Sequence, residues 1–185
     1  MKIINAITKS FLASILLFSV SSCTVTTSTG LGGLSIDTSS IKITNFAGGV
    51  DTIREDKTFV TGETAKISFK ANGLKIIDGK IKATEDVVIK NEGKEILNQK
   101  DFLGPDGITV NVGSSGNNGI FTGDVALTIK EALKGNVSIN VTVRDLNAPE
   151  SMTSFETGFT VKWGNNMLSE NNFQIAYFFR YFSSF

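Results

Sequence analysis

The sequence predicts an all-β protein, an antiparallel β-sandwich of about seven or eight strands over residues 41–163. Apolar and polar residues alternate there in short runs, the period of a strand with one buried face and one solvated face. Turn-forming pairs, such as Asn72-Gly73, Asp78-Gly79 and Asn118-Gly119, stand between the runs. Short strands separated by such turns are typical of a β-sandwich.

Each run places apolar residues two positions apart. The apolar members are Ile41 and Ile43; Ala65, Ile67 and Phe69; Val87 and Ile89; Val125, Leu127 and Ile129; Val137, Ile139, Val141 and Val143; and Phe159, Val161 and Trp163. Residues 130–134 predict a single helical turn. Residues 97–120, rich in Gly, Asn and Ser, predict a long connection, which is either a binding loop or a surface excursion.

Composition excludes several kinds of function. Apolar residues make up 41% of the 185 residues, so a buried core is expected. Lys plus Arg and Asp plus Glu are both 18, so no basic surplus exists to bind nucleic acid. The chain has no histidine, which removes the commonest general base and zinc ligand. The single cysteine excludes an intramolecular disulfide and a thiolate metal cluster.

The first residues have the pattern of a secretory signal peptide. Lys2 and Lys9 give a positive start, residues 11–20 form a short apolar run, and small residues follow. The run is about half the roughly 20 residues that span a bilayer as a helix. We therefore expect an exported protein without a transmembrane helix in this segment.

The end of this segment, Val20-Ser21-Ser22-Cys23, resembles the lipobox of bacterial lipoproteins. The resemblance implies cleavage after Ser22 and a diacylglycerol thioether on Cys23, so that the lipid anchors the protein to the cell membrane or outer membrane. In lipoproteins of enteric bacteria an Asp after the cysteine favours inner-membrane retention, so Thr24 favours the outer membrane. The alternative is an ordinary signal-peptidase site, since Val20 and Ser22 also fit its −3 and −1 positions.

The expected organisation has four parts. Residues 1–22 are the signal peptide, and residues 23–40 are the lipidated cysteine with a flexible tether rich in Ser, Thr and Gly. Residues 41–163 are the sandwich. Residues 164–185 form an aromatic-rich tail, which packs on the sandwich, lies at a membrane interface, meets a partner or is an aberrant reading-frame end.

Residues 133–161 resemble the last two strands of bacterial immunoglobulin-like and cadherin-like modules. The positions that fit are Gly135, Ile139, Val141, Val143, Asp145, Phe159 and Val161. Val137 stands where the family has an aromatic residue, so the hydrogen bond of that corner is absent. The resemblance implies an immunoglobulin-like sandwich and says almost nothing about function.

The best candidate for a cation site is the segment after the first of these strands. Cadherin-like modules bind Ca²⁺ with acidic residues at their ends, and Asp145 and Asn147 offer oxygen ligands. The family motif has more acids, including a second Asp that this chain lacks. We favour the alternative that Asp145 and Asn147 form the turn by bonding the backbone. No other cofactor is expected.

We interpret the chain as a non-enzymatic, membrane-anchored module that binds an envelope protein or glycan, or has a structural role in the envelope. No nucleophile elbow, P-loop or dinucleotide-binding motif is present. The first alternative is a periplasm-facing accessory subunit of an envelope complex. The second is a carboxylate-based hydrolase, which needs two acids about 5–10 Å apart.

Overall fold

The architecture comes from a computed structural model that describes residues 25–27, 30, 32–112 and 119–162. These residues form eleven β-strands and no helix, so none of their elements is a helix that could cross a membrane. In chain order, the strands are β1 (Thr26–Thr27), β2 (Ser35–Ala47), β3 (Val50–Ile53), β4 (Thr58–Val60), β5 (Thr64–Leu74), β6 (Lys80–Asn91), β7 (Lys94–Gln99), β8 (Ile108–Asn111), β9 (Gly119–Thr128), β10 (Gly135–Asp145) and β11 (Met152–Lys162).

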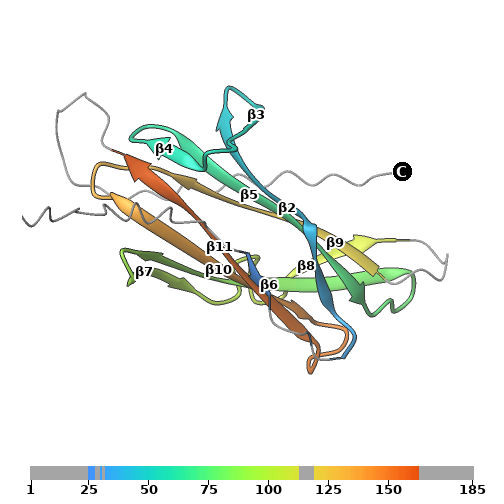
Figure 1. Cartoon of the computed structure of the whole chain (residues 1–185). Helices are drawn as coiled ribbons and strands as arrows, with labels where there is room; N and C mark the ends of the chain where they lie inside the picture. The colour runs from blue at the N-terminus through green and yellow to red at the C-terminus, as the bar shows by residue number, and fades with distance from the viewer. Residues whose placement is uncertain (1–24, 28–29, 31, 113–118, 163–185) are drawn as a thin grey trace, which may run out of the picture.

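The strands form two sheets that pack face to face (Figure 1). Sheet A has the order β1-β11-β10-β6-β7, with β4 paired to β11 and β8 paired to β6. Sheet B has the order β3-β2-β5-β9. Every strand pair is antiparallel except β4 with β11. The predicted antiparallel β-sandwich is confirmed. The strands outnumber the predicted seven or eight because β1, β3, β4 and β8 span two to four residues, too few for a visible alternation.

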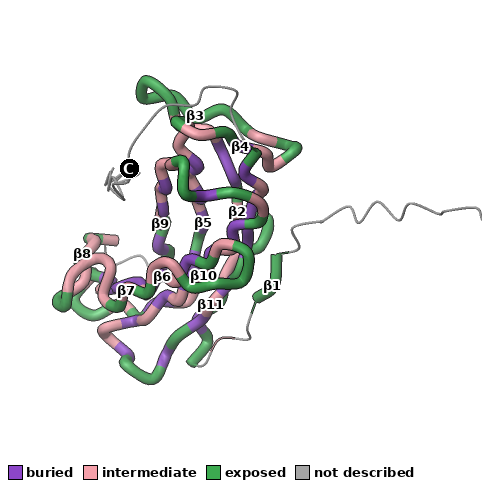
Figure 2. The backbone as a smooth tube through the Cα atoms, turned by 90° about the vertical axis from the view of Figure 1, so that its left-hand side faces the viewer, coloured by how far each residue is buried: buried purple, intermediate pink, exposed green. Residues whose placement is uncertain are grey.

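The core lies between the sheets, where the alternating apolar residues meet (Figure 2). The run on β10 is confirmed, since Val137, Ile139, Val141 and Val143 are all buried. Phenylalanines from both sheets join there. The rings of Phe69 on β5 and Phe155 on β11 lie 4.9 Å apart across the sandwich. A two-sheet core of this kind holds together chiefly through burial of apolar surface.

The folded region begins before residue 41, which corrects the predicted tether of residues 23–40. Leu34 is 1% exposed, and Ser35–Ser40 belong to β2. The pairing of β2 with β5 shifts register between Asp37 and Lys42, and the hydroxyl of Ser40 donates to the Asp37 carbonyl at 2.6 Å. This irregularity breaks the alternation, so the segment resembled a Ser-rich linker in the sequence.

Two further local predictions were wrong. The expected connection of residues 97–120 contains β8, which pairs with β6 from Lys80↔Asn111 to Ala83↔Ile108. The expected helical turn at residues 130–134 is a non-helical turn in which the Leu133 amide donates to the Lys130 carbonyl at 2.9 Å. The hairpin expected from the immunoglobulin-like resemblance is present as β10 and β11.

Candidate functional site

The predicted lipidation and cleavage residues, Cys23 and Ser22, lie outside the described residues, as does the aromatic tail of residues 164–185. The first described strand follows closely after Cys23. Thr26 and Thr27 of β1 pair with Glu156 and Phe155 on the edge of sheet A. The chain after Cys23 therefore meets the sandwich at β11.

Asp145 and Asn147 come together at the end of β10, where they tie two turns to each other. The Asp145 carboxylate is 1% exposed and accepts hydrogen bonds from the main-chain amides of Lys75 at 2.6 Å and Asn147 at 2.8 Å. The side-chain amide (Nδ2) of Asn147 donates to the main-chain carbonyls of Lys75 and Lys80 at 2.9 and 3.1 Å. The bond from the main-chain amide of Asn147 to Asp145 is the local bond that the turn interpretation expects, whereas the other three bonds reach Lys75 and Lys80. No group of three or more acidic, His or Cys side chains suited to a metal occurs in the described residues, and calcium here stays a prediction.

Asp145→Ala is expected to destabilise the protein by about 1–3 kcal/mol, because two amides lose a buried acceptor. Chemical denaturation of the variant measures this loss, and Asn147→Ala is the matched control that leaves the carboxylate in place. Millimolar Ca²⁺ should leave the wild-type denaturation midpoint unchanged. A rise with Ca²⁺ that disappears in Asp145→Ala would replace the turn interpretation with a calcium site.

Glu85 is a buried acid that the sequence interpretation missed. It lies on β6 in the inward series Ile81, Ala83, Glu85, Val87 and Ile89, and it is 1% exposed. Neither carboxyl oxygen has a hydrogen-bond partner among the described residues. The sequence does indicate this position, because Glu85 stands two residues before Val87 and four before Ile89 and so belongs to the same face of the strand. The predicted alternating run began at Val87 and therefore did not include Glu85.

Gly123 of β9 provides the space for this carboxyl group. A Cβ added at Gly123 would overlap Oε1 of Glu85 and Cζ of Phe69. A glycine inside a strand commonly marks such a close approach. Burial, and to a lesser degree the negative charge of Asp124, raises the pKa of Glu85 to about 8. The carboxyl group is therefore neutral and apolar-packed over most of the range below pH 8.

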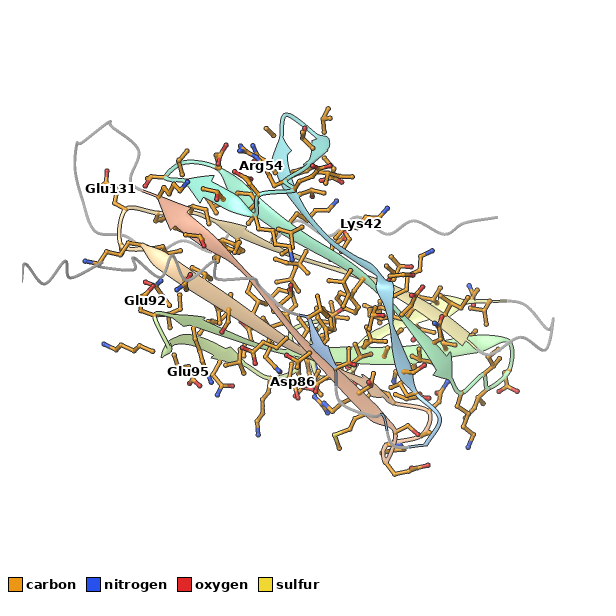
Figure 3. The ribbon with its side chains drawn as sticks, viewed as in Figure 1. Lys42, Arg54, Asp86, Glu92, Glu95 and Glu131 are labelled. Carbon is orange, nitrogen blue, oxygen red and sulfur yellow. The ribbon has the colours of Figure 1, made fainter. Side chains whose placement is uncertain are left out.

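Two further pairs of acidic residues lie on the outer faces of the sheets, and each pair contacts one basic residue. Arg144 lies between Asp86 and Asp101 on sheet A, with Nη2 at 2.8 and 2.6 Å from their Oδ1 atoms (Figure 3 labels Asp86). The hydrogen bonds that Arg144 donates to Asp86 raise the pKa of Arg144, and burial opposes this rise. On sheet B, Lys66 lies 2.5 Å from Asp51 and 3.7 Å from Asp124. Each pair of acids is thus bridged by a cation.

One side of the sandwich is left partly uncovered, and we call it the β9 flank. It consists of the edge of β9 that faces away from β5, together with the partly buried apolar side chains of residues 96–112. These side chains are Ile96, Leu97, Phe102, Leu103, Ile108, Val110 and Val112. Figure 2 shows β7 and β8 extending to one side past β9. Among the described residues, the sandwich therefore has a strand edge without a second neighbouring strand, and this edge lies beside apolar side chains.

Comparisons with known proteins give fold-level resemblances alone. No protein-family model matches the chain, and no curated protein sequence matches it. Among solved structures, the C-terminal domain of Wzt is 16% identical, with a TM-score of 0.43 over 77% of this chain and 80% of that one. A Niemann-Pick type C2 protein from the Japanese carpenter ant is 13% identical, with a TM-score of 0.36 over 66% and 95%. The CARDB domain of a Pyrococcus furiosus protein, in complex with di-metal ions, is 14% identical, with a TM-score of 0.28 over 70% and 94%. None of the three carries an argument about function.

Proposed function

We propose that this protein is a lipid-anchored, non-enzymatic binding module of the bacterial cell envelope. The observation that carries the anchor is Val20-Ser21-Ser22-Cys23, which follows an apolar run and contains the only cysteine of the chain. One acyl chain binds a membrane marginally and reversibly, whereas two or three chains hold a protein stably. A lipidated Cys23 would thus anchor the sandwich without a transmembrane helix.

The distance between the anchor and the folded region supports this proposal. The buried core begins at Leu34, so about ten residues separate it from Cys23. The first described strand, β1, begins at Thr26, three residues after Cys23, and pairs with β11. The sandwich would therefore stay close to the membrane surface, at a distance set partly by the pairing of β1 with β11.

The chemistry of the described acids supports a binding role over catalysis. Hydrolysis by two carboxylates needs one acid that donates a proton and another that attacks or activates water at the same bond. Asp86 and Asp101 share Arg144, Asp51 and Asp124 share Lys66, and Glu85 is enclosed between the sheets.

Cys23→Ala is expected to move the protein from the membrane fraction to the soluble or secreted fraction, because the variant has no thiol to carry the lipid. Membrane fractionation and incorporation of a labelled fatty acid measure the effect. Cys23→Ser is a second variant that keeps the size and polarity of the residue. If both variants remain membrane-bound and wild type takes up no label, the anchor is not a lipid on Cys23.

The same strains decide which side of the envelope the sandwich faces. Protease added to intact cells should cut the wild-type sandwich if the module faces outward, which favours an adhesive or glycan-binding role. Protection until the envelope is broken favours the accessory-subunit alternative. A periplasmic protein of known location serves as the control for envelope integrity.

A further inference from the structure

The two sheets end at different places on the β9 flank. Gly119 and Gly123 hold β9 directly over β6, because a Cβ at either position would overlap Ile81 or Glu85 of that strand. Sheet A continues past β6 with β7 at one end and β8 at the other. Sheet B has no described strand beyond β9. Sheet A is therefore about one strand wider, and strands in a sheet are about 4.8 Å apart.

This difference in width explains the burial of residues 96–112. Seven apolar residues of this stretch are only partly buried, although Leu97, Ile108 and Val110 pair with inward positions of β6. The fully covered strands β6 and β10 bury their inward apolar residues instead. One added strand beside β9 would cover these side chains and extend sheet B.

Residues 173–182, which lie outside the described residues, have the sequence that such a strand requires. Phe173, Ile175, Tyr177, Phe179 and Tyr181 stand at alternating positions, and Arg180 is the only charged residue of the ten. β9 also has ten residues, and Asp124 is its only charged one. The other positions hold Gln174, Ala176, Phe178, Arg180 and Phe182. A strand presents its odd-numbered residues on one face, so the first five side chains would meet the apolar surface together.

The chain can reach this edge. β11 ends at Lys162, beside Val60 of β4, and the Gly62 amide donates to the carbonyl of Ile129, the residue that follows β9. β11 therefore ends at the same end of the sandwich as β9. Ten residues, 163–172, extend to at most about 33 Å. The sandwich is about 10 Å thick, so this length suffices to reach the β9 edge and run back antiparallel to β9.

We propose that residues 173–182 add to the free edge of β9 as an antiparallel strand that covers the apolar side chains of residues 96–112. The charges of Asp124 and Arg180 indicate which face of the added strand points toward the core. Asp124 lies on the outer face of β9, where Lys66 contacts it. With Arg180 on that same outer face, Tyr177, Phe179 and Tyr181 face inward, toward the uncovered apolar residues. The opposite orientation would place Arg180 against Leu97, Phe102 or Val110.

Hydrogen–deuterium exchange of the β9 peptide, residues 119–128, tests the proposal on the full chain in mild detergent. With β5 as its only neighbour, β9 leaves about half of its amides unpaired, whereas two neighbours pair nearly all of them. We expect exchange of the free-edge amides to be about tenfold slower or more in the full chain than in a chain that ends at Lys162. Peptides of β5 and β10 serve as internal references.

Two variants of the full chain keep the test decisive if truncation prevents folding. Tyr177→Ser combined with Phe179→Ser and Tyr181→Ser should release the β9 amides. Phe178→Ser combined with Phe182→Ser, on the opposite face, should leave them protected. Equal exchange in the full chain and both variants overturns the proposal. Protection that persists in the truncated chain and grows with protein concentration also overturns it, and assigns the edge to a second copy.

Discussion

Glu85→Gln is expected to remove a large loss of stability that the wild type undergoes between about pH 4.5 and pH 8. In the folded protein the pKa of Glu85 is raised to about 8, from an ordinary value of 4.5, because the carboxyl group is buried and has no hydrogen-bond partner within the part of the chain that the structure describes. The unfolded chain gives up this proton near pH 4.5, while the folded chain keeps it. Stability then falls by about 1.4 kcal/mol per pH unit.

The sign of this dependence distinguishes Glu85 from an ordinary acid. A carboxylate stabilised by a partner has a lowered pKa and stabilises the fold as pH rises. Glu85 does the opposite: its contribution to stability is highest below pH 4.5, falls through the window, and levels off above pH 8. Over the whole window the loss is on the order of 5 kcal/mol. No histidine is present to titrate in the same range.

Denaturation with urea at several pH values from 5 to 9 measures the prediction. Near pH 5 the Gln variant should resemble the wild type, since both side chains are neutral. At pH 8 it should be several kcal/mol more stable. Glu95→Gln, at an exposed position of β7, is the matched control and should change stability by less than about 0.5 kcal/mol. A wild type whose stability is flat or rises over this window would show that Glu85 ionises at an ordinary pH.

Phe155→Ala is expected to cost about 3–5 kcal/mol, the second large effect. Phe155 is 1% exposed on β11, and its ring meets that of Phe69 at 4.9 Å from the opposite sheet. Removing the ring leaves a void at the contact between the sheets, where β5 and β11 cannot move together without disturbing their own hydrogen bonds. Domains of this size are stable by about 5–15 kcal/mol, so this is a large share.

The measurement is best made near pH 5, where Glu85 is neutral in the folded protein. Met152→Ala is the control on the same strand. Met152 is 41% exposed, so its loss should change stability by no more than about 0.5 kcal/mol. A Phe155→Ala variant within 1 kcal/mol of wild type would mean that the sheets do not pack at this position.

Patterns that repeat within one strand were predictable from the sequence. The alternation over residues 65–69 and 137–143 placed their apolar members in the core, because a strand alternates its faces whatever the rest of the fold does. The segment of residues 35–40 was not predictable in this way. Its pairing with β5 is broken by the register shift after Asp37, and its Ser and Thr side chains show no apolar period.

The candidate site was predictable only in part. The bond from the main-chain amide of Asn147 to Asp145 follows from the local preference of Asp for such turns, so neighbouring sequence sufficed for it. The bonds that join Asp145 and Asn147 to Lys75 and Lys80 connect residues at least 67 positions apart, and neighbouring sequence does not predict them. The isolation of Glu85 depends on Gly123, which is 38 positions away and belongs to the other sheet. A sequence shows which face of its strand residue 85 shares with Val87 and Ile89, but not which residue lies opposite it in the other sheet. The uncovered flank likewise depends on where β9 lies over β6.

The order of the strands has a consequence for how the chain folds. β10 and β11 form a hairpin with neighbouring partners, such as Arg144 with Met152, whereas β5 and β9 begin their pairing at Thr64 with Thr128. Contacts so distant in the chain must overcome a loop-closure entropy before they stabilise anything, and sandwiches rich in them fold in milliseconds to seconds. Sheet B cannot be completed until β9 has emerged, about two-thirds of the way along the chain. During synthesis, the edge of β5 that pairs with β9 must therefore remain without this partner strand until β9 has been made.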